Sequence, residues 1–230
     1  MRSLHRRLAA LAVVVTVASS LAAQSSTAPE LVEGSDAALA SGEYYAAIEG
    51  YREALGQNPN YLDALLGLAE SYYWLGEYDL AQEYVDRASR LARSRPEVMN
   101  LTARIAIGRG DLQAAERAFD RVRELEPNNV DATIGRAELA LARGQGTEAV
   151  NRLEEALRLN PNQRKALLSL VLIYEYMGDR EVAQRYLEIA RSVHRDRPEV
   201  HILAAEYYLR AGRYADAARA ARTAQALDPF

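Results

Sequence analysis

The feature that most constrains this chain is a glycine that recurs at a fixed spacing. Each of six glycines stands 34 residues after the one before it: Gly42, Gly76, Gly110, Gly144, Gly178 and Gly212. An alanine follows five residues after every one of them, from Ala47 to Ala217. A period of this length is the sequence signature of a repeat protein, in which each repeat is one supersecondary element. We therefore expect stacked copies of a 34-residue repeat.

Composition and residue placement predict that each repeat is a helical hairpin. Alanine, leucine, arginine and glutamate dominate, and these residues favour helices. Glycine suits the end of a helix, because it adopts a left-handed conformation at little cost. Prolines stop the second helix in four copies: Pro59, Pro127, Pro161 and Pro229. The recurring alanine predicts a close approach of the two helices that leaves no room for a larger side chain.

The second copy carries the clearest family signature. Its first helix has the large, large, small and aromatic residues Leu65, Leu68, Ala69 and Tyr72, and its second helix has Ala81, Val85 and Ala88. With the 34-residue period, these residues resemble the tetratricopeptide repeat family. Other copies depart at positions that are usually large or apolar: Gly34, Ala38, Thr133, Arg136 and His201. The resemblance implies an all-α, right-handed α-solenoid of six repeats, whose first helices line a concave groove.

The chain divides into three expected parts. Residues 1–23 are expected to form a signal peptide and residues 24–27 a short linker. The rest is expected to be the repeat domain, with repeats at 28–61, 62–95, 96–129, 130–163, 164–197 and 198–230.

The signal peptide is predicted from the order of charge, apolar run and small residues at the N-terminus. Arg2, Arg6 and Arg7 precede an 11-residue apolar run, Leu8 to Ala18, which small residues follow. We expect cleavage near Ala22 or Ala23 and a periplasmic or secreted protein; an uncleaved membrane tether is the alternative. The run is shorter than the roughly 20 residues that span a bilayer as a helix. The 27 arginines against one lysine favour a GC-rich bacterial genome.

Several classes of chemistry find no support in the sequence. The net charge is −4, whereas a nucleic-acid-binding domain is expected to be basic. The chain has no cysteine, and His194 and His201 lack a recognised metal-ligand spacing. Every glycine of the series is expected at a hairpin turn, not in a phosphate-binding loop. We therefore expect no catalysis and no cofactor.

The candidate binding residues come from the resemblance, which places ligands against positions 2, 5, 9, 12 and 13 of the first helices. Counted from the first residue of each repeat, these positions are mostly apolar or aromatic in the middle and edged with carboxylates. The predicted groove set is Leu66, Glu70, Tyr73, Trp74, Asn100, Arg104, Ile107, Ile134, Glu138, Leu141, Leu168 and Tyr176. The same positions hold Leu172, Ile202 and Leu209, which lie outside that set. The competing interpretation is that such residues seal contacts between neighbouring first helices.

These residues predict a partner and a function. Charge complementarity favours a protein or peptide segment that is apolar with basic flanks, and not a nucleic acid. The chain is expected to be a protein-interaction scaffold in bacterial envelope assembly or export. The alternative is an adaptor segment of a larger outer-membrane export protein of the polysaccharide-secretion type. Membrane contact is expected only through an uncleaved signal or a partner, and self-association through the uncapped C-terminal end is a further alternative.

Overall fold

A computed structural model describes residues 26–228 of the chain. This part contains twelve α-helices and no strand. It divides into two compact units, unit 1 up to Arg93 and unit 2 from Ser94 onward. The all-α helical repeat fold that the sequence predicts is confirmed. The predicted signal peptide lies outside the described residues, so the division into signal, linker and repeats stays a prediction.

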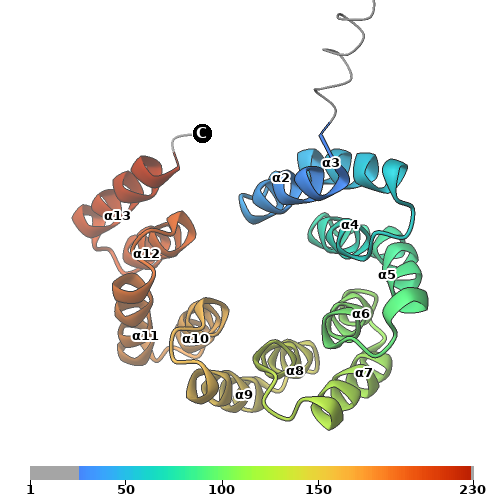
Figure 1. The fold of residues 1–230 in the computed structure, drawn as a ribbon. Helices are drawn as coiled ribbons and strands as arrows, with labels where there is room; N and C mark the ends of the chain where they lie inside the picture. The colour runs from blue at the N-terminus through green and yellow to red at the C-terminus, as the bar shows by residue number, and fades with distance from the viewer. Residues whose placement is uncertain (1–25, 229–230) are drawn as a thin grey trace, which may run out of the picture. The chain divides into compact units, whose positions relative to one another are not determined.

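Each copy supplies a first and a second helix (Figure 1). The first helices are α2 (Ala28–Ala40), α4 (Leu62–Trp74), α6 (Pro96–Gly108), α8 (Val130–Ala142), α10 (Arg164–Tyr176) and α12 (Pro198–Arg210). The second helices are α3 (Tyr44–Gln57), α5 (Tyr78–Ala92), α7 (Leu112–Leu125), α9 (Gly146–Leu159), α11 (Arg180–Val193) and α13 (Tyr214–Leu227). Within unit 2 the first helices lie along one side and the second helices along the other (Figure 1). A surface built only from first helices therefore exists in this unit.

The recurring glycine closes the turn between the two helices of each hairpin. All six have φ between +72° and +83°, a conformation that a side chain would strain. In the second copy the amide of Glu77 donates to the carbonyl of Tyr72 (2.9 Å), and the amide of Gly76 donates to that of Tyr73 (3.0 Å). These two bonds cap the C-terminus of α4 in the manner of a Schellman motif.

The two helices of a hairpin pack on the recurring alanine. Its side chain is fully buried in the first five copies, from Ala47 to Ala183, and nearly so at Ala217. Larger apolar residues surround it, such as Leu153 and Leu170 in a cluster shared by α8, α9 and α10. Within each unit, a repeat therefore buries apolar surface between its own two helices and against the repeat that follows it in that unit.

Tyrosines tie the second helix of one repeat to the first helix of the next. The hydroxyl of Tyr174 (α10) donates to Glu154 Oε1 (α9) at 3.3 Å, and Tyr186 (α11) donates to the same oxygen at 3.3 Å. The rings of Tyr174 and Tyr186 are stacked, with centroids 5.8 Å apart. One junction later, Tyr208 (α12) donates to Glu188 Oε1 (α11) at 2.9 Å. The same relative positions thus carry the same type of contact.

No helix among residues 26–228 is both long enough and apolar enough to cross a bilayer.

Candidate partner-binding wall of the first helices

The predicted groove residues lie on the first helices, and we call them the first-helix wall. In unit 1 the wall consists of Leu66, Glu70, Tyr73 and Trp74, all on α4. In unit 2 it consists of Asn100, Arg104, Ile107, Ile134, Glu138, Leu141, Leu168 and Tyr176, on α6, α8 and α10. Each unit is considered separately below.

The wall of unit 1 ends in an aromatic cluster. Trp74 has 44% of its surface exposed. Its ring is stacked on Tyr44, with centroids 6.4 Å apart, and meets Tyr73 edge-on at 5.4 Å. Its Nε1 donates to Glu70 Oε1 at 3.4 Å, and Leu66 and Tyr73 are half-buried. The indole is therefore held in place by its neighbours while one face remains accessible.

Two wall residues of unit 2 are buried within the protein. Ile134 and Asn100 have only 4% and 8% of their surface exposed. Asn100 Nδ2 donates to Asn129 Oδ1 (3.2 Å), the residue just before α8. At these two positions the side chains serve packing between repeats, which is the competing interpretation of position 5.

Among the first helices of unit 2, the large exposed apolar side chains lie on α8, α10 and α12. Leu141 is 44% exposed, Leu172 49%, Ile202 50% and Leu209 58%, and Tyr176 is almost fully exposed. Leu172, Ile202 and Leu209 were not in the predicted set. Their membership in the same helical stripe, at positions 9, 5 and 12, was the signal that would have included them.

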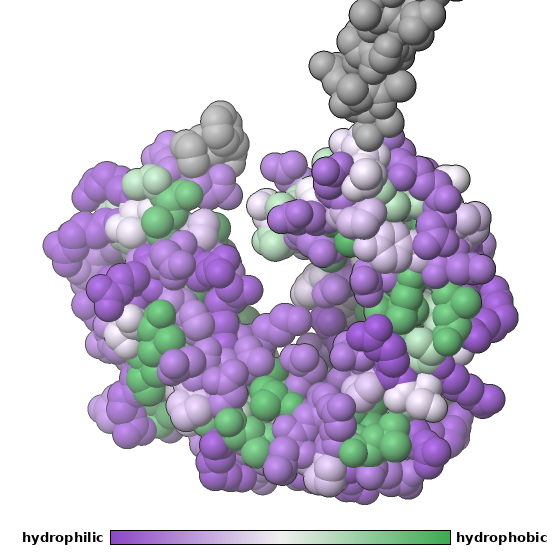
Figure 2. All heavy atoms as spheres, viewed as in Figure 1, coloured by the Kyte–Doolittle hydropathy of each residue, from purple (hydrophilic) through white to green (hydrophobic). Residues whose placement is uncertain are grey.

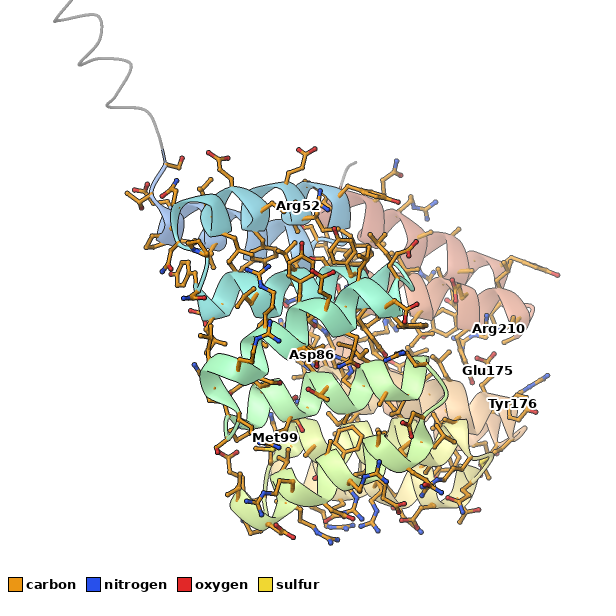
Figure 3. The ribbon with its side chains drawn as sticks, turned by 90° about the vertical axis from the view of Figure 1, so that its right-hand side faces the viewer. Arg52, Asp86, Met99, Glu175, Tyr176 and Arg210 are labelled. Carbon is orange, nitrogen blue, oxygen red and sulfur yellow. The ribbon has the colours of Figure 1, made fainter. Side chains whose placement is uncertain are left out.

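An ion pair joins the exposed ends of α10 and α12. Arg210 Nε lies 2.7 Å from Glu175 Oε1, and its Nη2 lies 2.8 Å from Oε2, so the contact is bidentate. These two side chains point toward each other, whereas the neighbouring Tyr176 points out to solvent (Figure 3). The pair fixes the spacing of the two helix ends beneath the exposed tyrosine.

A hollow of about 440 Å³ lies beside this ion pair. Leu172, Tyr176, Tyr207 and Ala211 provide most of its apolar lining. The hydroxyl of the buried Tyr207 donates to the carbonyl of Arg180 (2.9 Å) and anchors the start of α11 there. Burial, with the nearby Glu175 carboxylate, raises the pKa of Tyr207. The hollow is large enough to receive one apolar side chain of a partner.

Arginines neutralise many of the carboxylates that edge the wall. Glu138 is paired with Arg104 (3.2 Å), Glu175 with Arg210, and Glu199 with Arg164 (3.1 Å). Among the described residues no arginine pairs with Asp131 or with Asp63, its counterpart on α4. The negative edge that the sequence suggested is therefore weaker in the folded protein.

On the face of unit 2 that Figure 2 presents, apolar residues occur in short patches separated by hydrophilic ones. Isolated apolar residues of this kind are ordinary on a protein surface and need no partner. What distinguishes the first helices α10 and α12 is that several large exposed apolar residues lie on them near a hollow.

The two described histidines lie within hydrogen-bond distance of backbone carbonyls in loops. His194 Nε2 lies 2.7 Å from the carbonyl oxygen of Asn162, and the buried His201 has Nε2 at 2.9 Å from that of Arg195. Within residues 26–228, no three acidic, histidine or cysteine side chains are grouped as metal ligands would be.

Two family models match the chain along most of its length. Both describe the tetratricopeptide repeat; one matches residues 38–105 and 106–172, and the other matches residues 168–230.

Curated relatives share the chain over part of its length. The protein CTR9 homolog of Arabidopsis thaliana is 26% identical over 159 residues, which make up 67% of this chain and 15% of that protein. The cellulose synthase operon protein C of Pseudomonas fluorescens is 28% identical over 146 residues, or 60% of this chain and 11% of that protein. The chain thus spans well under a third of the length of these relatives.

Solved structures share the fold. A thermophilic repeat protein of Thermus thermophilus covers 80% of this chain with a TM-score of 0.71 and 19% identity; all of that protein is covered. A tetratricopeptide repeat protein of Parabacteroides merdae covers 87%, with 78% of its own length, a TM-score of 0.67 and 19% identity. With the family models, these likenesses agree on the fold. The chain therefore belongs to the tetratricopeptide repeat family, whose members are protein-binding scaffolds.

Proposed function

We propose that the chain is a non-enzymatic scaffold that binds an apolar segment of a partner protein along the exposed face of its first helices. The observation that carries this proposal is the group of large exposed apolar residues on α10 and α12: Leu172, Tyr176, Ile202 and Leu209. A cluster of such residues on one face costs solubility, so it is typical of an interaction surface.

The aromatic cluster of unit 1 supports the same function. Tryptophan and tyrosine are enriched among the residues that dominate binding energy at protein interfaces. Trp74 is already held by Tyr44 and Tyr73, so little side-chain freedom is lost when a partner covers it. A rigid, half-exposed ring of this kind is suited to anchor an apolar side chain.

The partner segment is expected to be mainly apolar. A basic flank would find Asp63 on unit 1, or Asp131 for a segment bound on unit 2, because no described arginine neutralises either carboxylate. Glu138 and Glu175 already have arginine partners, so they add less to the attraction. We therefore expect apolar contacts to contribute more than charge to the binding of the partner segment.

The N-terminal sequence supports action in the bacterial periplasm. Residues 1–23 have the charge and apolar pattern of a secretory signal. Together with a protein-binding wall, this pattern favours a role in envelope assembly or export.

An adaptor segment of a larger export protein is the second candidate. The likeness to cellulose synthase operon protein C, of which this chain spans 11% of the length, supports it. Deletion of the gene is expected to leave polysaccharide export intact under the first proposal and to stop it under the second.

Affinity capture from envelope extracts, followed by mass spectrometry, tests the proposed function. The comparison uses the wild-type protein, the wall variant Tyr73→Ala/Trp74→Ala and the control Tyr45→Ala, whose side chain is 75% exposed on the second helix α3. We expect the wild type and the control to capture the same partner and the wall variant to lose it. Capture by the wall variant at the wild-type level would refute a binding role for the aromatic cluster.

A further inference from the structure

A second hollow of unit 2 lies on the other side of α8 from the wall. It has a volume of about 660 Å³ and is lined by residues of α7, α8 and α9. At about 100° per residue in a helix, Arg136 and Arg143 lie roughly half a turn around α8 from Ile134 and Leu141. A ligand in this hollow would therefore not compete for the wall.

Arg136 is the unusual residue of the hollow. It stands at position 7 of its repeat, where the other copies have uncharged residues: Gly34, Leu68, Thr102, Leu170 and Ala204. Its side chain is only 23% exposed, and its closest carboxylate, Asp120, is 3.8 Å away. Among residues 26–228 no group accepts a hydrogen bond from Arg136, although a guanidinium has five N–H donors.

The carboxylates nearby are engaged by other arginines. Arg143 holds Glu116 through two bonds of 2.8 and 3.2 Å. Arg152 contacts Glu148 at 2.7 Å and Glu155 at 3.0 Å. Asp120 is closer to Arg123, at 3.2 Å, than to Arg136. Arg136 thus has only a long contact with Asp120, and the cations Arg123 and Arg152 lie near it.

This arrangement is costly to the protein in the absence of an anion. Burial, with the positive charges of Arg123 and Arg152, lowers the pKa of Arg136. The repulsion between like charges destabilises the folded state. A bound oxyanion would offset this repulsion, and charge-assisted bonds to arginine are among the strong hydrogen bonds of proteins.

We propose that this hollow binds a phosphate-class oxyanion through Arg136, with Arg152 and Arg143 beside it. These guanidinium groups come from α8, α9 and the turn after α8, so they approach the hollow from different directions. A phosphate group, whose oxygens point in several directions, suits them better than a carboxylate, whose two oxygens are coplanar. The first turn of α9 also lines the hollow, and its dipole favours an anion. The volume exceeds that of phosphate itself and lies within the range of roughly 300–1,000 Å³ that is usual for ligand sites. A phosphoryl group on a larger molecule therefore fits as well as free phosphate.

Thermal unfolding and calorimetric titration with inorganic phosphate test the proposal, at an ionic strength held constant with chloride. Arg136→Leu is the informative variant, since leucine occupies the same position, fully buried, as Leu68 and Leu170. Arg158→Leu, an exposed arginine on α9 outside the hollow, is the matched control for the loss of one charge. Arg136→Gln replaces Arg136→Leu in the titration if the leucine variant does not fold.

We expect phosphate to raise the melting temperature of the wild type and of Arg158→Leu, and not that of Arg136→Leu. Without phosphate, Arg136→Leu should melt higher than the wild type, because the partly buried cation that Arg123 and Arg152 repel is gone. Phosphate affinity should fall about tenfold or more in either Arg136 variant, the equivalent of one lost charge-assisted bond. Absence of a phosphate effect on the wild type, or an equal effect on all variants, would overturn the proposal.

Glycerol 3-phosphate distinguishes the source of the oxyanion. Tighter binding of this ester than of inorganic phosphate would assign the hollow to a phosphoryl group on a larger ligand. Weaker binding would assign it to the free ion. Acetate at the same concentration is expected to change the melting temperature little. If acetate stabilised the protein as much as phosphate does, a preference for a phosphate-class oxyanion over a carboxylate would be contradicted.

Discussion

The ring of Phe119, on α7, lies directly against Gly135, on α8. A Cβ added to Gly135 would stand 2.3 Å from Cε1 and Cζ of that ring, far inside contact distance. In unit 1 Tyr51 lies against Gly67 in the same way, with the same 16-residue separation and an approach of 2.2 Å. A ring on the second helix of one repeat thus requires a glycine on the first helix of the next.

Gly135→Ala is expected to destabilise the protein by about 1–3 kcal/mol, the usual cost of overpacking a filled core. Phe119 is fully buried, so its ring must be displaced to admit the added methyl group. Urea unfolding followed by circular dichroism measures the change. The exposed Gly56→Ala is the control, because an added Cβ there meets nothing within 4 Å.

The double variant Phe119→Leu/Gly135→Ala shows whether the ring causes the cost. At the next junction the equivalent residues are Leu153 and Ser169, so a leucine accommodates a side chain at this position. We expect the double variant to be more stable than the sum of the two single changes predicts. Strict additivity would mean that the ring and the glycine are not coupled.

Stability should fall at high pH because of Tyr186. Burial, with the adjacent Glu154 carboxylate, raises the pKa of Tyr186 to about 12. An unfolded chain loses that proton near pH 10, so between about pH 10 and 12 the folded state binds more protons than the unfolded state. The free energy of unfolding therefore decreases as pH rises through this window, by at most about 1.4 kcal/mol per pH unit for this group.

Chemical unfolding at several pH values between 9 and 12, on the wild type and Tyr186→Phe, checks this slope. The phenylalanine variant should show a shallower decline, though not a flat one, because the pKa values of Tyr174 and Tyr208 are also raised. Tyr214→Phe, on an exposed side chain, should match the wild type. Equal slopes for the wild type and Tyr186→Phe would rule out this origin of the pH dependence.

The elements of the fold were predictable because their signals are local. A turn glycine and a buried alanine recur in every copy, and the first helices begin at the residues from which the repeats were counted, such as Leu62 and Val130. Neither signal depends on distant parts of the chain, so the period alone is enough to place them.

The exposure of the wall was not predictable from the same signals. Ile134 and Ile202 occupy the same repeat position, yet they are 4% and 50% exposed. Ile134 packs in a cluster with Leu170 of the following first helix, whereas the described residues provide no first helix beyond α12. A repeat pattern predicts the same exposure for both isoleucines, because it does not say whether another repeat packs against each copy.

Charge pairing was missed for a related reason. The sequence shows the carboxylates Glu138 and Glu175 along the first helices, and Arg104 among the groove residues, but not that arginines of the neighbouring copy pair with these carboxylates. Arg104 is 34 residues from Glu138, and Arg210 is 35 residues from Glu175. The two residues of such a pair are about one repeat apart in the sequence. The pairing can therefore be predicted only by assuming that equivalent positions of successive repeats lie side by side.

The most direct test of binding along the first helices is a titration of the captured partner into two variants. Each variant loses one exposed tyrosine, one from a first helix and the other from a second helix. Tyr176→Ala removes the almost fully exposed ring at the end of the first helix α10, and Tyr214→Ala removes a 70% exposed ring from the second helix α13. Calorimetry should show affinity about tenfold or more weaker for Tyr176→Ala, as for an anchor residue of an interface, and unchanged for Tyr214→Ala. Wild-type affinity for Tyr176→Ala, or an equal loss in both variants, would contradict binding along the first helices.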